Sequence, residues 1–489
     1  MRAAVVLQRG AAGALRLDWA APAAITVVAL FVYINGAFFS TLSALHVDLS
    51  INFTAAHAIR NGQNPYGETT LLERARQLGS PSNLGEPKPL IYESLFTSYI
   101  QPPVSALAIV PLTFLPWREA TRLYLFINNA LLAGAVVLTL YTVRPTISAR
   151  WAVAGAAVIV AFYSQIYGSL ALGQVDPTIT FLLAVGLWGY SRDKPAVTAG
   201  AIALGTAIKL IPALLLLYFL WKREYRVVAW GVIIGVALFL LSVVAAGPDT
   251  YRSYLTETVP ALMKGSTQYT NISIGGAYNR LFVKDLAPPG PLLSLDEVPF
   301  KLAGRVLTGL TLAAVLGLVA ATIGRKPLRE GAGKGAVPEQ AFVIEYYLVV
   351  AVGLLISSVT WEFYVVWLLP LFLVGFLAPS RVLPGGPRRW FIMAALAIAY
   401  VGLNYPGDHY LFDVNNVFYH PDWVPGVMVE DVVNLYPLGP DSRGNLPVVP
   451  ILRMTVLCFL ALVLLAAILD VRQGEDSADA TRADPGPAA

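Results

Sequence analysis

The sequence predicts an all-α polytopic membrane protein, and three observations support this: the composition, the long apolar runs and the placement of the basic residues. Of the 489 residues, 56% are hydrophobic and only 13% are charged, and the mean hydropathy is +0.63. A water-soluble globule of this size needs far more polar surface. The net charge of +4 and the single cysteine, Cys458, exclude a nucleic-acid binder and a disulfide scaffold.

Eleven apolar runs are long enough, or nearly long enough, to cross a bilayer as helices. The first, residues 20–45, follows three arginines and lacks a nearby cleavage site, so we expect a retained anchor with a cytoplasmic N-terminus. The others are residues 123–143, 151–167, 178–190, 197–221, 227–246, 302–323, 341–359, 363–377, 390–403 and 448–469.

Charge indicates how these runs are arranged. The basic connectors at residues 222–226, 325–334 and 381–389 are expected on the cytoplasmic side, together with the C-terminal tail. The number of spans must then be even, and about twelve satisfy this. Either residues 104–115 cross as a short helix, or residues 197–221 are two halves that meet near Lys209. The choice decides the side on which residues 173–176 lie.

We expect one membrane-embedded domain over residues 1–470 and a disordered cytoplasmic tail over residues 471–489, which is rich in Asp, Ala, Gly and Pro. Three long connectors, residues 46–101, 247–301 and 404–447, are expected on the exoplasmic side. The third is strongly acidic, as is typical of translocated loops. Loops of this length between hydrophobic helices indicate function.

Asp48 follows directly after the first span, close to the membrane surface. Low dielectric near a bilayer raises the pKa of a carboxyl toward neutrality, which suits it to accept a proton from an attacking hydroxyl. The alternative is an acid that merely marks the end of a helix in water.

Residues 52–61 place Phe53 on one face and His57 on the other, which predicts a short helix lying in the membrane interface. Prolines in residues 102–116 predict broken helix packed against protein.

The order of short motifs along the first half of the chain resembles a known family. These are Asp48, Phe53, Ala56, Gly62-x-Asn64-Pro65-Tyr66, Pro102-Pro103, Pro111-Leu112, Gly173-Gln174-Val175-Asp176, and Gly205 to Lys209 with Pro212. The chain resembles integral-membrane glycosyltransferases of the GT-C superfamily, and in particular the polyprenol-phosphate-mannose-dependent mannosyltransferases of glycosyltransferase family 87, which has an arabinofuranosyltransferase branch. The resemblance implies a GT-C fold with short interfacial helices in its exoplasmic loops, a catalytic first loop, and Asp48 as the catalytic base.

The resemblance also has a departure. Members of the family commonly carry Trp-x-His-Tyr at the mouth of a late helix, whereas this chain has Trp361-Glu362-Phe363-Tyr364. Phe363 removes a donor and an acid from the expected site, and the donor or acceptor can differ accordingly. Glu362 either compensates by holding the sugar or caps the start of a helix. Trp361 and Tyr66 are candidate sugar-binding or acceptor-binding residues on the resemblance alone.

Four polar residues complete the candidate site. Lys209 lies far from either end of an apolar run, so it must snorkel, form a pair or face a polar cavity. In a lipid-phosphate-sugar transferase it could bind the donor phosphate, and Arg280 is the second candidate for that role. Gln174 and Asp176 could hydrogen-bond sugar hydroxyls if their turn is exoplasmic, and are only helix caps if it is cytoplasmic.

The sequence contains no pattern for a bound metal or cofactor. Residues 331–335 lack the spacing of a phosphate-binding loop, no dinucleotide fingerprint follows a strand, and no His-Cys spacing suggests zinc. We therefore expect no metal and no cofactor other than the donor substrate.

The function predicted from these features is transfer of a sugar, in the first place mannose, from a polyprenyl-phosphate donor to a lipid-linked or glycan acceptor. The reaction would take place with inversion at the exoplasmic face of a bacterial plasma membrane. The partners are membrane lipids, the donor and the acceptor, with no nucleic acid. The alternatives are a polyprenyl-phosphate-arabinose-dependent arabinofuranosyltransferase, a lipid-glycan transporter or flippase, and an inactive scaffold in envelope assembly. A transporter would show two matched halves with polar residues near the bilayer midplane, and this chain instead gathers its polar residues in one-sided loops.

Overall fold

The structure is a computed structural model that describes residues 19–39, 41–43, 46–66, 99–263, 265–266, 271–282, 302–325, 340–404 and 448–483. Within these ranges it is almost entirely helical, and the β-interaction found there is an isolated antiparallel bridge between Asn271 and Trp361. The all-α prediction is therefore confirmed. Most of the first and third expected loops, much of the second, and residues 484–489 lie outside the described residues.

The chain is a multi-pass membrane protein. Five described helices are long and apolar enough to cross a bilayer: the first helix (Trp19–Phe39), α6 (Trp117–Val143), α12 (Tyr225–Ala246), α16 (Leu302–Ile323) and α22 (Val448–Ala483). Two further helices, α7 (Ala149–Ala161) and α8 (Ser164–Leu172), meet at 56° and together would make a sixth span. The expected total of about twelve spans stays a prediction.

Shorter helices fill the space between these spans. They are α9 (Asp176–Ser191), α10 (Pro195–Ile208), α11 (Ala213–Trp221), α17 (Gln340–Ile356), the 3₁₀ segment η5 (Glu362–Leu368) that continues into α18 (Leu369–Leu377), α19 (Pro379–Val382) and α20 (Pro387–Asn404).

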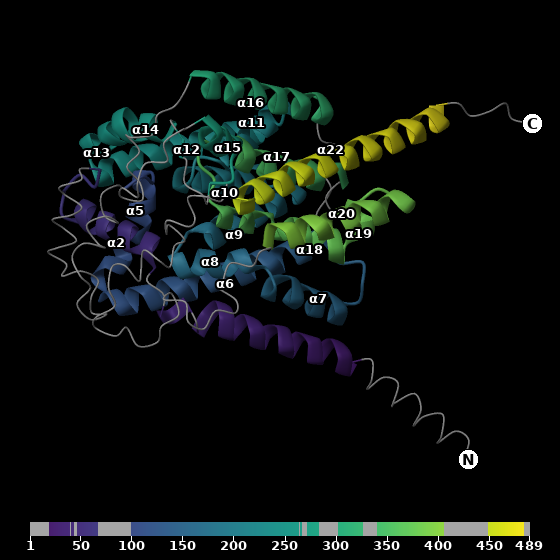
Figure 1. Ribbon diagram of the computed structural model, residues 1–489, viewed down its shortest axis with the longest axis horizontal. Helices are drawn as coiled ribbons and strands as arrows, with labels where there is room; N and C mark the ends of the chain where they lie inside the picture. The colour runs from purple at the N-terminus through teal and green to yellow at the C-terminus, as the bar shows by residue number, and fades with distance from the viewer. Residues whose placement is uncertain are drawn as a thin grey trace, which may run out of the picture.

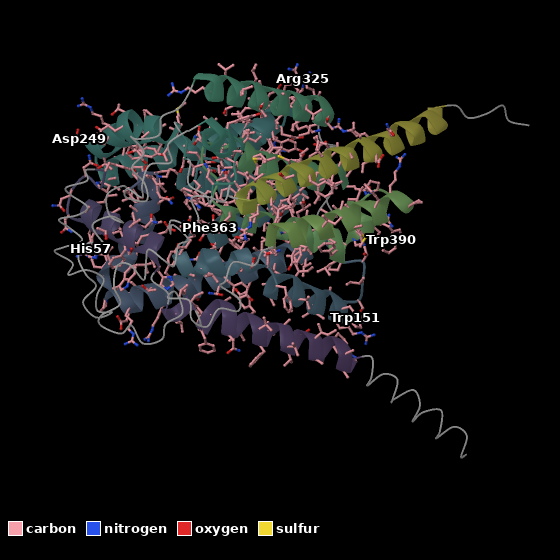
Figure 2. The ribbon with its side chains drawn as sticks, in the orientation of Figure 1. His57, Trp151, Asp249, Arg325, Phe363 and Trp390 are labelled. Atoms are coloured by element: carbon pink, nitrogen blue, oxygen red, sulfur yellow. The ribbon has the colours of Figure 1, made fainter. Side chains whose placement is uncertain are left out.

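Short helices form within or directly after the first two expected loops. They are α2 (Val47–Arg60), α5 (Pro103–Ile109) with its 3₁₀ extension η3 (Val110–Phe114), α13 (Pro248–Ser253), η4 (Tyr254–Thr258), α14 (Val259–Met263) and α15 (Ile274–Phe282). Figure 1 shows α2, α5 and α13 at the end of the long axis opposite the start of the first helix and the end of α22. In Figure 2, His57 and Asp249 mark this α2 end, whereas Trp151 and Trp390 mark the opposite end.

The apolar run at residues 197–221 is split into two helices, which was one of the two alternatives for an even number of spans. The first half, α10, ends at Ile208; Lys209 is extended (φ −140°, ψ 131°), and α11 begins at Ala213. Pro212 lacks the N–H that a continuous helix needs at that position. The carbonyl of Ile208, left open by the break, accepts a hydrogen bond of 2.9 Å from Ser105 Oγ on α5. This bond satisfies a polar group that would be costly inside a membrane.

The other alternative was that residues 104–115 cross the membrane. They instead form α5 and η3, a helix broken near Pro111, which lies with α2 at the α2 end (Figure 1). The prediction of broken helix packed against protein is confirmed for residues 102–116.

Two local expectations need correction. The helix predicted over residues 52–61 exists, but it begins at Val47 and is covered by protein on all sides. Residues 49–59 are all buried, because α5, η3 and the start of α6 cover the helix and Phe53 packs edge-on against Trp117. Its place relative to the membrane interface stays a prediction. The tail expected to be disordered from residue 471 continues α22 as helix as far as Ala483. Residues 471–483 contain three Ala, two Arg, one Glu and one Gln, which are good helix formers, and only one Gly and no Pro.

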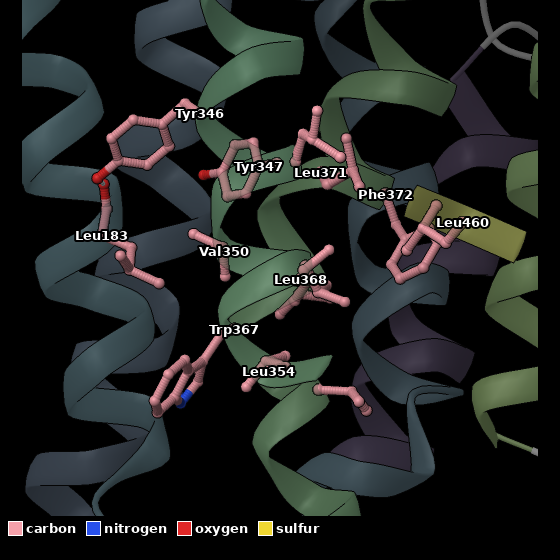
Figure 3. Close-up of a cluster of buried hydrophobic side chains, with 14 of the residues drawn as sticks. Leu183, Tyr346, Tyr347, Val350, Leu354, Trp367, Leu368, Leu371, Phe372 and Leu460 are labelled. Carbon is pink, nitrogen blue, oxygen red and sulfur yellow. Dashed lines mark hydrogen bonds between the residues drawn. The ribbon is translucent and has the colours of Figure 1, made fainter. Parts of the chain in front are cut away.

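The core lies between α9, α17, η5, α18 and α22. Figure 3 shows Tyr346, Val350, Trp367, Leu368 and Phe372 packed together, with the Tyr346 hydroxyl donating to the carbonyl of Leu183 at 3.0 Å. α17 is buried almost along its whole length, which explains why its sequence is apolar on every face.

Glu345 on α17 joins three helices through buried charges. Its carboxylate lies 3.1 Å from Lys222 Nζ at the end of α11 and 2.7 Å from Arg472 Nη2 on α22, and it accepts a hydrogen bond of 2.9 Å from Tyr218. Glu345 is 1% exposed and Lys222 is 2% exposed. A buried charge whose partner is removed is strongly destabilising.

We predict that Glu345→Gln lowers the free energy of unfolding by about 3–5 kcal/mol, because it leaves two cations without their shared carboxylate. Thermal unfolding in detergent measures this. Asp193→Asn is the matched control, since Asp193 contacts Arg226 at 3.7 Å in an exposed pair and such pairs contribute little. Equal melting temperatures for Glu345→Gln and the wild type would show that the cluster does not hold the helices together.

Candidate active site

Asp48 lies in the first turn of α2, and the residue that precedes this helix docks it onto α8. His46 adopts a left-handed conformation (φ 47°), and its backbone N–H donates to the carbonyl of Ala171 at 3.2 Å. Its ring Nδ1 lies 3.2 Å from the carbonyl of Leu170. Burial lowers the pKa of His46 to about 4, so the ring is neutral at pH 7 and donates through Nδ1. The start of α2 is thereby attached to the end of α8.

Gly173, at the turn between α8 and α9, permits this close approach. Its φ is +70°, which disfavours other residues, and a Cβ built on it would lie 2.5 Å from the Cβ of Leu49. No side chain fits between the two elements without displacing α2. The turn therefore presents Gln174 directly to the first turn of α2.

A chain of hydrogen bonds runs from Asp48 into the protein. Gln174 Nε2 donates to Asp48 Oδ2 at 2.6 Å, and Gln174 Oε1 accepts from Lys209 Nζ at 3.2 Å. Lys209 Nζ also lies 2.8 Å from Asp176 Oδ1. The three elements involved are the α2 start, the α8–α9 turn and the α10–α11 break, so the four predicted residues Asp48, Gln174, Asp176 and Lys209 are brought together at one site.

The ion pair of Lys209 and Asp176 is deeply buried, with exposed fractions of 6% and 0%. Trp367 Nε1 donates to Asp176 Oδ1 at 2.9 Å, and Ser169 Oγ lies 3.4 Å from Oδ2. Lys209 Nζ lies 3.5 Å from the centre of the Tyr364 ring, a cation–π contact. Burial of both charges is tolerated because each has several partners.

Asp48 differs from Asp176 in that its side chain is only half-buried. Desolvation raises the pKa of Asp48 to about 6, against the lowering effects of the Gln174 hydrogen bond and the Lys209 charge. The neighbouring Asp176 charge raises it further. Asp48 is therefore mostly ionised at pH 7, with a proton affinity near that pH, which is the range suited to a general base.

Other predicted residues lie elsewhere. Tyr66 packs with Tyr99 and Tyr254, at ring-centre distances of 5.2 and 5.5 Å, and donates to the carbonyl of Gln101 at 2.6 Å. Trp361 is buried and bridges to Asn271. Arg280 lies on α15, and its side chain is outside the described residues. The sugar, acceptor or phosphate contacts expected of these three residues stay predictions.

Glu362 begins η5, and its carboxylate forms an ion pair with Arg453 Nη1 on α22. Arg453 is fully buried. Glu362 thus lies at a helix start, which agrees with the interpretation of this residue as a helix cap. Its carboxylate is also paired with the Arg453 guanidinium. Phe363, at the position of the family histidine, is 8% exposed and packs edge-on against Tyr364.

Trp367 and Ser169 are site residues that the sequence pattern does not reveal. Trp367 lies among apolar residues of an expected span, where aromatic side chains are common, and Ser169 lies on α8 seven residues before Asp176. A polar indole N–H on a fully buried helix needs an acceptor, which is the one signal that could have pointed from Trp367 to Asp176.

We predict that Gly173→Ala lowers both stability, by about 1–3 kcal/mol, and activity, because its Cβ would push the start of α2 and Asp48 away from Gln174. Gly62→Ala is the matched control: Gly62 has the same φ of +70° and nothing within 4 Å of a Cβ. It should lose stability from backbone strain alone and keep its activity per folded molecule. Equal loss of specific activity in the two variants would refute the role of the close approach.

Comparisons with known proteins indicate the class of enzyme. The model of glycosyltransferase family 87 matches residues 99–337. A polyprenol-phosphate-mannose-dependent α-(1-2)-phosphatidylinositol mannoside mannosyltransferase of Mycobacterium tuberculosis is 28% identical over 364 residues, which cover 73% of this chain and 75% of that relative. An α-(1→3)-arabinofuranosyltransferase of the same species is 27% identical over 183 residues, or 36% of this chain and 41% of that relative.

Among solved structures, ArnT from Cupriavidus metallidurans bound to undecaprenyl phosphate aligns with 95% of this chain and 81% of its own, with 14% identity and a TM-score of 0.37. A likeness of this size carries no argument about the site. The family match and the sequence relatives confirm the resemblance expected from the order of the motifs, and the transporter alternative is set aside. The chain is an integral-membrane glycosyltransferase related to glycosyltransferase family 87.

Proposed function

We propose that the chain transfers a sugar from a polyprenyl-phosphate donor to a hydroxyl of a lipid-linked or glycan acceptor, with Asp48 as the general base. The observation that carries the proposal is the position of Asp48: a half-buried carboxylate with a pKa of about 6, held by Gln174 at the end of the molecule where the short helices gather. The relatives that use polyprenol-phosphate mannose support the class of donor.

The chemistry follows from the requirements of the reaction. The acceptor oxygen attacks the anomeric carbon, its proton passes to Asp48, and the bond from the anomeric carbon to the phosphate oxygen breaks on the opposite face. Attack opposite the leaving group inverts the anomeric centre. The leaving group is the lipid phosphate, which is stable as an anion. The donor is therefore already activated, and the proposed reaction needs no nucleotide and no cofactor. A positioned base of this kind contributes about two to four orders of magnitude in rate.

A cation beside the leaving phosphate would stabilise the charge that develops on it. Lys209 and Arg280 are the candidates. Lys209 is paired with Asp176 and buried, so its charge is largely compensated before a donor binds, and this favours Arg280 on α15 as the direct phosphate ligand. Gln174, Asp176, Tyr66, Trp361 and Glu362 remain candidate contacts of the sugar or acceptor.

The sugar is proposed to be mannose. The similarity to the mannosyltransferase extends over about twice the length of the match to the arabinofuranosyltransferase, 364 against 183 residues. Arabinofuranose is the second candidate, because Phe363 replaces the histidine found in the mannosyl prototypes. Incubating the purified enzyme with each polyprenyl-phosphate sugar in turn separates the two.

We further propose that Asp48 faces the exoplasmic side of a bacterial plasma membrane, with both termini in the cytoplasm. Two observations support this orientation. The start of the first helix and the end of α22 lie at the same end of the molecule, opposite α2 (Figure 1). The basic residues that precede the first helix favour the cytoplasm for that end.

We predict that Asp48→Asn folds normally and loses transfer activity by at least about a hundredfold, because an amide cannot take up the proton. The amide oxygen introduced by this substitution would still accept the Gln174 hydrogen bond, so the site keeps its shape.

In the wild type, kcat/KM should fall below a pH of about 6 as the Asp48 carboxylate becomes protonated. Radiolabelled donor and a lipid extract provide the assay. Asp249→Asn, at an exposed acid of α13, is the control and should be fully active. Retained activity in Asp48→Asn would reassign the base.

Sidedness is tested with single cysteines in a Cys458→Ala background. Gln63→Cys, in the exposed turn after α2, should react with a membrane-impermeant maleimide in intact cells. Asp193→Cys, in the exposed turn between α9 and α10, should react only after the membrane is opened. The reverse pattern would place Asp48 on the cytoplasmic side and contradict the proposal.

A further inference from the structure

Gln174 stands between the proposed base and a buried ion pair, and both polar atoms of its amide are engaged. Its Nε2 donates to Asp48 at 2.6 Å and its Oε1 accepts from Lys209 at 3.2 Å. The side chain is 3% exposed. This arrangement differs from the role expected from the sequence, in which the amide binds sugar hydroxyls directly.

Lys209 decides which face of the amide meets Asp48. An ammonium group has donors and no acceptor, so it selects Oε1 and leaves Nε2 for the carboxylate. Rotation of the amide by half a turn would set Oε1 against the Asp48 carboxylate and Nε2 against the ammonium, and both contacts would be repulsive. The orientation is therefore fixed by charge, independently of how an amide is assigned in a structure.

Lys209 is itself held in place by two contacts besides Gln174. Asp176 lies 2.8 Å from its Nζ, and the Tyr364 ring lies 3.5 Å away. Asp176 is in turn held by Trp367 at 2.9 Å. The direction of the Gln174 amide thus depends on residues of α9, of the break between α10 and α11, and of η5. None of these hydrogen bonds reaches Asp48 except through Gln174.

We propose that Gln174 is the positioning residue of Asp48, and that the Lys209–Asp176 pair acts through it by fixing the orientation of the amide. The proposal rests on the function proposed above, in which Asp48 is the base. Gln174 holds Oδ2 toward the protein, so Oδ1 is the oxygen that receives the proton from the acceptor hydroxyl. The bond also favours the ionised form of Asp48, against the effect of burial.

The charged and titratable groups around Asp48 come from several elements. Asp176 on α9 raises the pKa of Asp48, and Lys209 after α10 lowers it. The hydroxyls of Tyr124 on α6 and Tyr364 on η5 interact electrostatically with Asp48, and both remain neutral in the assay range. His46, two residues before Asp48, is neutral between about pH 5 and 8, because burial lowers its pKa to about 4. Asp176 keeps its ion pair with Lys209 when only Gln174 is replaced, so a change in the acidic limb between about pH 5 and 8 in a Gln174 variant is assigned to Asp48.

The test is the pH profile of kcat/KM for Gln174→Met and Gln174→Glu in the full-length enzyme in detergent or nanodiscs. Methionine has a similar volume and no donor. The pH at which kcat/KM falls to half on the acidic side should therefore be higher by about one unit, as expected for loss of a hydrogen bond to a carboxylate. Glutamate adds a like charge and should move it further. In Gln174→Met, activity should recover toward the wild-type value at high pH. A merely structural role would lower the rate equally at every pH.

Gln165→Met is the matched control. Gln165 is a buried glutamine on α8 that donates to the carbonyl of Leu403 at 3.0 Å, so its loss costs a similar bond without touching Asp48. The acidic limb of this variant should coincide with that of the wild type. An equal shift in Gln165→Met and Gln174→Met would overturn the proposal.

The ion pair is tested with the double variant Lys209→Met/Asp176→Asn, which avoids leaving one buried charge unpaired. The amide then keeps its donor and loses its fixed direction, so the acidic limb should move in the same direction as in Gln174→Met, by a smaller amount.

An unchanged limb in Gln174→Met would overturn the positioning role of Gln174, while an inactive Asp48→Asn would leave the assignment of the base in place. An active Asp48→Asn would instead overturn the base assignment itself, and the proposal with it.

Discussion

The close approach of the α2 start to the turn between α8 and α9 is the constraint on which the rest of the site depends. It is possible because residue 173 is glycine, with φ +70° and no Cβ to meet Leu49. Once the two elements touch, His46 bonds to the end of α8, and Gln174 reaches the carboxylate of Asp48. The base is thereby attached to the end of α8, in the membrane-embedded part of the protein.

Broken helices make such a site compatible with a hydrocarbon environment. The breaks between α7 and α8, at Lys209 and before α18 each expose backbone groups that a continuous helix would satisfy. The structure supplies partners for them: Ser105 for the carbonyl of Ile208, and Asn404 Oδ1 for the N–H of Ser164 at 2.8 Å. The break at Lys209 and the turn between α8 and α9 bring Lys209 and Asp176 to one point, where opposite charges and aromatic rings compensate for their burial.

The sequence was sufficient to predict the helical membrane class and the break near Lys209 as one of two alternatives. It also singled out Asp48, Gln174, Asp176 and Lys209, which the structure brings together. It could not predict how they pair, because Gln174 is 126 residues from Asp48 and 35 from Lys209, and nothing local records such contacts. Trp367 was hidden among apolar residues for the same reason. The burial of the helix at residues 52–61 was not predicted, because an amphipathic pattern does not tell lipid from a covering layer of protein. The helical tail was missed because its composition suits both disorder and an extension of α22.

The central claim is that Asp48 takes the proton of the acceptor hydroxyl while a lipid-borne sugar is transferred beside it. Cryo-electron microscopy of the Asp48→Asn enzyme with a polyprenyl-phosphate sugar tests this most directly, since the substitution would trap the donor. The account predicts density for the sugar next to residue 48, with its anomeric carbon facing the Oδ1 position and its phosphate on the side away from the residue. Density for the sugar at another end of the molecule, or separated from residue 48 by protein, would contradict it.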